Sequence, residues 1–193
     1  MSALPKQEAR YTIEEYLALE AAAETRYEYF AGEVFDMAGA TLNHNRIARN
    51  VTNTLERKLE GHSCEALPSD MRVKVPRALP YRYPDASVVC GEVQIEKLGA
   101  LELLLNPMLL VEVLSESTEK YDREGKFLAY QSIPSFQEYL LIEQDRYHVT
   151  QYVRQDAGAW LRRDCIGIET EVKLSSVDCT LTLAEIYRDV IIV

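Results

Sequence analysis

The sequence predicts an α/β fold in which a mixed β-sheet is flanked by helices and continues into an antiparallel β-meander. Three observations support this class: a long amphipathic helical pattern, a nearly continuous apolar run at residues 107–115, and alternating segments after Pro134. At 193 residues the chain has the length of one domain, and we expect a single domain over residues 1–193.

The N-terminal part predicts a helix followed by a hairpin. Thr12 and Glu15 have the spacing of a capping box, so a helix should begin here and end near Ala23. Residues 26–30 and 33–37 are then two short strand candidates joined by a glycine-containing turn.

The longest helix is predicted at residues 41–61. Its apolar residues recur at every fourth position and should form one buried stripe, made of Ile47, Val51, Leu55 and Leu59. Gly61 is a natural end for this helix, because glycine readily adopts the left-handed conformation that terminates helices.

The middle of the chain predicts the central part of the sheet. Strands are expected at residues 65–68, 71–76 and 84–90, whereas residues 92–106 have a weak pattern that predicts a loop or a short helix. The apolar run at residues 107–115 is typical of a central strand that is covered on both faces.

The C-terminal part begins with a helix, capped by Ser115 or Ser117 and limited by Pro134. Three segments then alternate apolar with polar side chains, which predicts the antiparallel meander: residues 136–143, 147–155 and 158–165. Residues 181–190 predict a short closing helix.

The composition is that of an ordinary globular protein, with 47% hydrophobic and 27% charged residues, which excludes a disordered chain. The apolar stretches are too short to span a membrane and the N-terminus lacks a signal-peptide pattern, so we expect a cytoplasmic protein without a membrane partner. The widely spaced cysteines argue against a zinc site and predict reduced thiols at Cys64, Cys90, Cys165 and Cys179.

The net charge of −10 argues at first against a nucleic-acid partner, but the charge is unevenly distributed. Residues 42–82 carry 8 basic and 4 acidic side chains, whereas the segments before and after them are strongly acidic. This basic segment could guide a phosphate backbone; alternatively, its charges lie on solvated helix and strand faces.

Two carboxylates lie in apolar strand candidates: Asp85 follows Pro84, and Glu112 lies within the apolar run. An ionised carboxylate in a buried strand is unfavourable unless it is paired or binds a cation. If the two strands are neighbours, Asp85 and Glu112 form a site for a divalent cation, with the Val113 carbonyl as a third ligand. Mg²⁺ prefers such oxygen ligands, and Mn²⁺ could substitute for it.

Lys126 lies on the helix expected after the Glu112 strand, and that helix would bring it back past the strand. Asp85, Glu112 and Lys126 in this order indicate metal-assisted phosphodiester cleavage, because the ion activates water and stabilises charge on the phosphate. Lys126 could orient the attacking water, or remove its proton if its pKa is depressed. The alternative is a solvated helix lysine.

These residues resemble a known family over about residues 12–187. The most similar segments are YRYPDASVVC, LLVEVLSESTEKYDREGKFLAY and GAW. The family is the Uma-type "putative restriction endonuclease" family, which is grouped with the PD-(D/E)XK nuclease superfamily. The resemblance implies a restriction-endonuclease-like core with Mg²⁺-dependent DNA cleavage, in which Asp85 and Glu112 match the two acids. Leu114 stands where the superfamily has a lysine, and Lys126 would supply that amine from the next helix.

Five further side chains are candidates for supporting the site: Glu28, Glu33, His44, Asp70 and Tyr130. Each also has a plainer explanation. The two glutamates could be solvated hairpin charges, Asp70 a turn residue, His44 a capping or surface residue, and Tyr130 a packing residue between helix and sheet.

Three functions stay open at this point. The first is a metal-dependent endonuclease that hydrolyses DNA, the second is a nuclease-fold binding module without catalysis, and the third is a metal phosphoesterase acting on RNA or small phosphodiesters. A homodimer is also expected, because the antiparallel strands and the apolar C-terminus leave surface for a second copy, and two-fold symmetry addresses both strands of DNA.

Overall fold

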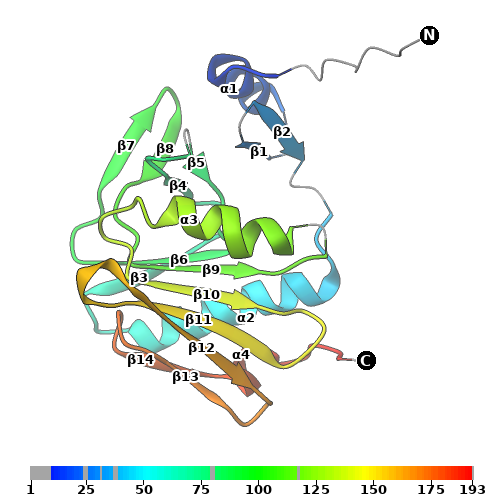
Figure 1. The fold of residues 1–193 in the computed structure, drawn as a ribbon, viewed down its shortest axis with the longest axis vertical. Helices are drawn as coiled ribbons and strands as arrows, with labels where there is room; N and C mark the ends of the chain where they lie inside the picture. The colour runs from blue at the N-terminus through cyan, green and yellow to red at the C-terminus, as the bar shows by residue number, and fades with distance from the viewer. Residues whose placement is uncertain are drawn as a thin grey trace.

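The computed structural model describes residues 10–23, 26–30, 32–36, 39–78, 81–116 and 118–192. It confirms the α/β class, with a six-stranded mixed sheet between helices (Figure 1). The strand order in this sheet is β12-β11-β10-β9-β6-β3. The strands are β3 (Cys64–Pro68), β6 (Ala86–Cys90), β9 (Leu109–Val113), β10 (Glu138–Ile142), β11 (His148–Arg154) and β12 (Trp160–Ile166). Only β9 and β10 pair in parallel here, and β10, β11 and β12 form the predicted antiparallel meander.

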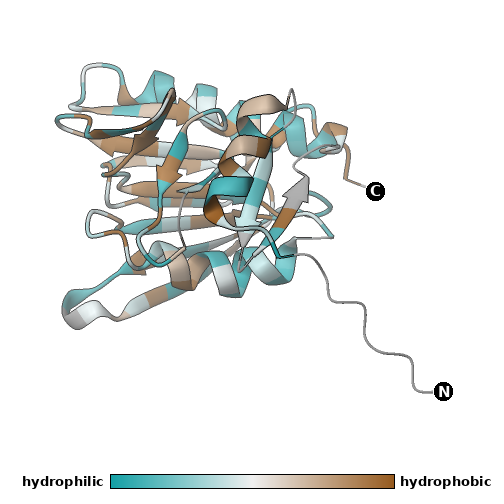
Figure 2. Ribbon diagram, turned by 90° about the horizontal axis from the view of Figure 1, so that it is seen from above, coloured by the Kyte–Doolittle hydropathy of each residue, from teal (hydrophilic) through white to brown (hydrophobic). Residues whose placement is uncertain are grey.

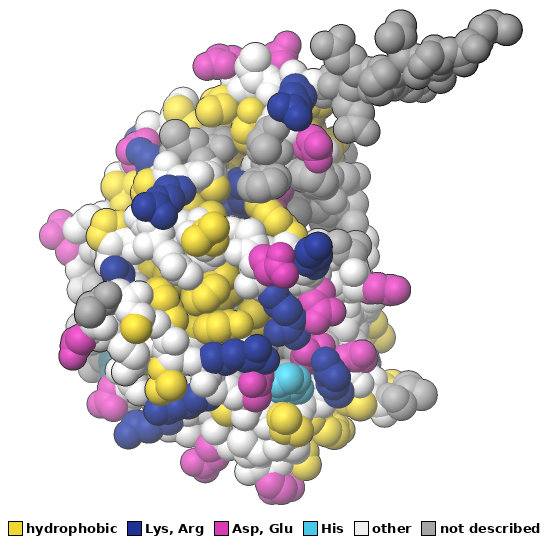
Figure 3. Space-filling model, viewed as in Figure 1, with side chains coloured by type: hydrophobic (Ala, Val, Ile, Leu, Met, Phe, Trp, Pro, Cys, Tyr) yellow, Lys and Arg dark blue, Asp and Glu magenta, His cyan; other side chains and the backbone are white. Residues whose placement is uncertain are grey.

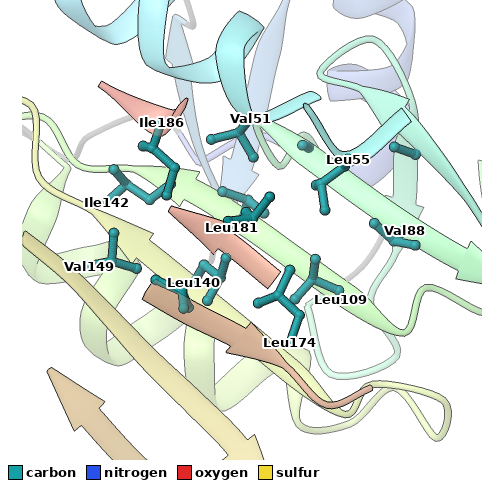
Figure 4. Packing of buried hydrophobic residues seen from close by; sticks show 14 of the residues in the cluster. Val51, Leu55, Val88, Leu109, Leu140, Ile142, Val149, Leu174, Leu181 and Ile186 are labelled. Carbon is teal, nitrogen blue, oxygen red and sulfur yellow. The ribbon is translucent and has the colours of Figure 1, made fainter. Parts of the chain in front are cut away.

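One face of this sheet packs against the long helix α2 (Leu42–Leu59). The predicted stripe of α2 is buried and lies over Leu109, Leu140 and their neighbours (Figure 4). The same apolar cluster includes residues of β13 (Glu171–Leu174), β14 (Cys179–Thr182) and α4 (Leu183–Ile186). Viewed from above, apolar residues concentrate on the strands of the sheet (Figure 2). This is expected, because burial removes apolar side chains from water.

The opposite face is covered by a helix with two parts. Its first part is a π-helix, η1 (Tyr121–Lys126), and its second part is the short α-helix α3 (Phe127–Tyr130), which runs alongside β6 and β9 in Figure 1. Leu110, Leu114 and Tyr139 belong to the apolar cluster beneath this helix. The helix follows the Glu112 strand, as predicted.

The N-terminal elements form the predicted helix and hairpin. The helix α1 (Ile13–Ala22) has both halves of the capping box between Thr12 and Glu15. The strands β1 (Tyr27–Phe30) and β2 (Glu33–Asp36) pair in antiparallel fashion. Tyr16 of α1 packs against Tyr81 and Tyr83, which lie just before the Asp85 strand.

A second sheet of four strands was not predicted. It has the order β5-β4-β8-β7 and consists of β4 (Arg72–Lys74), β5 (Tyr81–Arg82), β7 (Ile95–Leu98) and β8 (Leu101–Leu104). The expected loop or short helix at residues 92–106 is therefore wrong, because Leu98 pairs with Leu101 in a tight hairpin. Gly99 takes φ of +62° in its turn, a conformation that glycine adopts without strain.

Two further expectations are corrected. The closing helix spans only Leu183–Ile186, since residues 179–182 pair with β13 as a strand. Cys64 and Cys90 form a disulfide rather than two reduced thiols, because they face one another across β3 and β6; the sequence separation of 26 residues gave no sign of this. Within the described ranges, no helix is long and apolar enough to cross a membrane.

Candidate active site

Asp85 and Glu112 lie on adjacent strands and on the same face of the sheet. β6 and β9 are antiparallel and pair Ala86 with Val111, so Asp85 and Glu112 are the next two residues to face one another. Directly opposite side chains of antiparallel strands point to the same side. That side is the one covered by η1 and α3, because Leu110 and Leu114 alternate with Glu112 and pack beneath them.

Asp85 ends the hydrogen-bonded ladder between these strands. Its amide donates to the Val111 carbonyl at 2.9 Å, and its Oδ2 accepts from the Val113 amide at 2.7 Å. The carboxylate therefore takes the place of a strand carbonyl, which fixes its direction. Its side chain remains 16% exposed, so it can also meet a ligand.

Glu112 is buried, with only 3% of its surface exposed. Its Oε2 lies 3.1 Å from the Lys126 Nζ, and its Oε1 accepts from the Tyr130 hydroxyl at 2.7 Å. The structure thus brings two predicted residues, Lys126 and Tyr130, directly to Glu112.

Lys126 is surrounded by three carboxylates rather than by solvent. Besides Glu112, its Nζ lies 3.2 Å from Asp122 Oδ1 and 3.4 Å from Glu28 Oε1. Asp122 and Lys126 are four residues apart in η1, and Glu28 reaches the group from β1, where it also accepts from the Tyr83 amide at 3.2 Å. A π-helix inserts one extra residue per turn and is frequent at functional sites.

These contacts decide the charge of the lysine. Burial alone would lower its pKa, but Glu112, Glu28 and Asp122 raise the pKa of Lys126 well above its usual value. This direction favours a protonated Lys126 that orients the attacking water over one that removes its proton. Burial raises the pKa of Glu112 and of Asp122, and the ammonium only partly offsets this.

His44 lies in the first turn of α2 with its Nε2 3.4 Å from Asp85 Oδ2. The cap of this helix is Thr41, whose hydroxyl accepts from the His44 amide, so His44 is not the capping residue. Burial tends to lower the pKa of His44, but the hydrogen bond to Asp85 and its negative charge outweigh burial, and the pKa is raised.

These groups border a cavity of about 1120 Å³. It lies between the N-terminal hairpin, the start of α2, the end of β9 and η1, and its described lining includes Arg26, Glu28, His44, Asp85, Glu112 and Lys126. None of the eight basic residues in the segment 42–82, all of which are described, lines it. Arg82, for example, is 1% exposed and donates to the Tyr121 hydroxyl. On the face in Figure 3, basic and acidic side chains are interspersed.

Two of the candidate residues lie away from the acid pair. Glu33 is exposed and does not line the cavity. Asp70 has a side chain that is 74% exposed and forms an ion pair with Arg26 in the turn after β3. Sequence reasoning did not select Asp122 or Arg26; for Asp122, the spacing of four residues from Lys126 on one helix was the available signal.

The donor types at this site suit Mg²⁺, since Asp85 and Glu112 present carboxylate oxygens to one cavity. Both oxygens of Glu112, however, contact Lys126 or Tyr130. Among the described residues, no three acid, histidine or cysteine side chains are arranged to hold a metal ion. A cation at Glu112 would therefore replace part of its contact with the ammonium.

A mixed sheet with two facing acids on adjacent strands, and a lysine brought back to them by the next helix, defines a protein of the restriction-endonuclease-like class. The chain belongs to the Uma2 family, described as "Putative restriction endonuclease", whose model matches residues 13–184. This match confirms the resemblance that the motifs indicated.

The chain is also similar to proteins of about its own length. The chain is 35% identical to the uncharacterized protein sll1609 of Synechocystis sp., covering 85% of this chain and 92% of that protein. It is 33% identical to the uncharacterized protein slr1290 of the same organism, covering 91% and 90%. A crystal structure described as a "putative nuclease" of the DUF820 group from Anabaena variabilis superposes with a TM-score of 0.73 at 18% identity, covering 91% of this chain and 97% of that one, which shows a shared fold.

Proposed function

We propose that this protein is a metal-dependent endonuclease that hydrolyses DNA phosphodiester bonds at the Asp85–Glu112 pair. The observation that carries the proposal is that these two acids face one another across β6 and β9 and share a cavity with the buried, charged Lys126. The family description and the description of the structural neighbour as a nuclease support the same chemistry.

In this proposal Asp85 and Glu112, with the Val113 carbonyl, hold Mg²⁺ or Mn²⁺. The bound ion would lower the pKa of a water molecule and neutralise charge on the phosphate. The Val113 amide fixes Asp85 and the Tyr130 hydroxyl fixes Glu112, so both acids are oriented before substrate arrives.

Lys126 acts in this proposal as a fixed positive charge. It is held by Glu28, Glu112 and Asp122, which face its three N–H donors, and a cation at Glu112 would release one donor for water or a phosphate oxygen. Preoriented charge of this kind stabilises the negative charge that develops during phosphodiester hydrolysis, without reorganisation of the site. His44 contacts the same Oδ2 of Asp85 as the Val113 amide does, and helps to orient this carboxylate.

The test is nicking of supercoiled plasmid with Mg²⁺ or Mn²⁺ by the wild-type protein, Asp85→Asn and Glu112→Gln. The wild type should nick, and both variants should lose most of this activity. Arg162→Gln, an exposed site on β12 outside the cavity, should nick as the wild type does. Equal nicking by all four proteins would show a contaminant and would refute the proposal.

A nuclease-fold binding module is the second candidate, favoured by Leu114, which is 3% exposed in the apolar cluster where the superfamily has a lysine. Titration calorimetry with Mn²⁺ separates the two, because DNA binding without metal binding would support the module. Comparing DNA, RNA and small phosphodiesters as substrates tests the phosphoesterase alternative. Light scattering tests the proposed homodimer.

A further inference from the structure

The mouth of the cavity carries an exposed guanidinium, that of Arg26. Arg26 directly precedes β1 and lies two residues before Glu28, so in extended backbone both side chains point to the same side. Both line the cavity. They differ in depth, because the side chain of Glu28 is 6% exposed against Lys126, whereas that of Arg26 is 44% exposed.

Arg26 is held in a defined position by the turn that follows β3. Its Nη1 donates to the Ser69 carbonyl at 3.2 Å, and its Nη2 pairs with the Asp70 carboxylate. Its guanidinium carbon lies 5.6 Å from the centre of the Tyr83 ring, within the range of a cation–π contact. These contacts engage part of the five N–H donors of the guanidinium and leave its charge at the cavity mouth.

The charges of the cavity make this position significant. Its described lining includes five acids, which are Glu28, Asp85, Glu112, Glu116 and Asp122. Arg26 and Lys126 are the arginine and lysine residues of that described lining. Lys126 is buried and three carboxylates surround it, so Arg26 carries the solvent-exposed charge of these two residues.

We propose that Arg26 forms a binding subsite for a backbone phosphate of the nucleic-acid strand, and that Asp70 competes with this phosphate for the guanidinium. The identity of the strand rests on the proposed function. Arginine binds phosphate oxygens through two parallel N–H donors, and the exposed ion pair with Asp70 is weak enough for a phosphate to displace it. Asp70 therefore weakens substrate binding, although it helps to place Arg26.

Binding of a fluorescein-labelled DNA oligonucleotide, followed by anisotropy over a salt series with Ca²⁺ or EDTA, tests this subsite. Arg26→Gln should weaken binding by about 5- to 20-fold and make the slope of log affinity against log salt shallower by about 1. Asp70→Asn should tighten binding by about 2- to 5-fold, because it frees the guanidinium. The double variant should bind as Arg26→Gln does.

Arg162→Gln is the matched control, since Arg162 is 54% exposed and pairs with Asp164 at 3.0 Å on β12, outside the cavity. It should bind as the wild type does, and thermal unfolding should show that all variants fold. Unchanged binding by Arg26→Gln, weaker binding by Asp70→Asn, or no DNA binding by the wild type would each overturn the subsite.

The outcome is separable from that of the proposed function. Metal-dependent nicking that is lost in Asp85→Asn, together with normal binding by Arg26→Gln, would leave the nuclease proposal standing without the subsite. Opposite shifts for Arg26→Gln and Asp70→Asn in a protein that nicks no DNA would keep the subsite in a binding module.

Discussion

Glu112 and Glu138 are two buried glutamates on the neighbouring parallel strands β9 and β10, but they face opposite sides of the sheet. Glu138 is in register with Leu109, on the α2 side, whereas Glu112 points towards η1. Glu138 accepts from Gln151 Nε2 at 2.5 Å and from the amide and hydroxyl of Ser176 at 3.1 and 2.6 Å. All of these donors are neutral, whereas Glu112 contacts an ammonium that two other acids share.

A buried acid can therefore stabilise the fold or belong to a functional site, depending on its partners. Hydrogen bonds satisfy Glu138 within its own surroundings, and burial still raises its pKa. Around Lys126, three acids share one cation, an arrangement with excess negative charge that does not help the chain to fold. Local arrangements that oppose stability are expected at functional sites.

The largest expected effect is on the rate of nicking, which should fall when Glu112 is replaced but not when Glu138 is. Glu112→Gln should reduce nicking by about a hundredfold or more, because it removes a proposed metal ligand. Glu138→Gln should leave nicking within about twofold of the wild type, since Glu138 lies on the far face of the sheet. Initial nicking rates measure both effects. Similar losses in the two variants would contradict the different roles of Glu112 and Glu138.

Lys126→Met should lower the free energy of unfolding by about 3–5 kcal/mol at pH 8, because it leaves three buried acids without their cation. Burial already raises the pKa of Glu112 and Asp122 in the folded protein. The folded variant therefore binds protons that the unfolded chain has released, and its stability should increase as the pH falls from 8 to 5.

Urea unfolding at both pH values measures this change. Lys58→Met is the control, since it removes an ion pair between Lys58 of α2 and Glu185 of α4. It should lower the free energy of unfolding by about 1 kcal/mol or less. A Lys126→Met protein as stable as the wild type at pH 8 would contradict the argument from excess charge.

A smaller effect is expected from the neutral donors of the two acids. Tyr130→Phe removes the hydroxyl that holds Glu112 Oε1, and Ser176→Ala removes one donor to Glu138. Each should lower the free energy of unfolding by about 1–2 kcal/mol. Only Tyr130→Phe should also slow nicking, so measuring stability and rate together shows whether the orientation of Glu112 matters.

The smallest effect concerns His44. NMR titration should give a pKa above 6.5 in the wild type, and Asp85→Asn should lower it. Because the folded value is raised, the pair contributes stability that is fully present below the unfolded pKa of about 6.5 and is lost as the pH rises through the folded value. A His44 pKa that does not respond to Asp85→Asn would show that the two side chains are not coupled.

The sequence predicted the acid pair because strand periodicity and burial act locally. The apolar run around Glu112 requires a covered strand, and a buried acid in it requires a partner. The face shared with Asp85 follows from register, which only the paired strands determine. Lys126 was predictable from its place on the following helix, and Asp122 from its spacing to Lys126. That Glu28 joins them from β1 follows only from the fold.

The fold favours the second interpretation of the basic segment, in which its charges lie on separate faces. Basic residues close together in sequence diverge when they fold: Lys58 pairs with Glu185, Lys74 with Glu96, and Arg82 enters the core. The exposed cation at the cavity mouth, Arg26, comes instead from the acidic N-terminal segment. The hairpin at residues 92–106 was missed because β7 mixes apolar and charged side chains on both of its faces. Ile95 and Lys97 are exposed, whereas Glu96 and Leu98 are half-buried, so apolar and polar residues do not alternate as they do in a typical strand.

The position of Lys126 changes how such proteins can be searched for. The ammonium reaches Glu112 from a residue 14 positions further along the chain, across the layer between helix and sheet. A sequence pattern that demands an amine immediately downstream of the second acid would discard this chain as inactive. A pattern that also accepts a lysine on the next helix, with an acid four residues before it, would retain this chain and others with the same arrangement of acid and lysine.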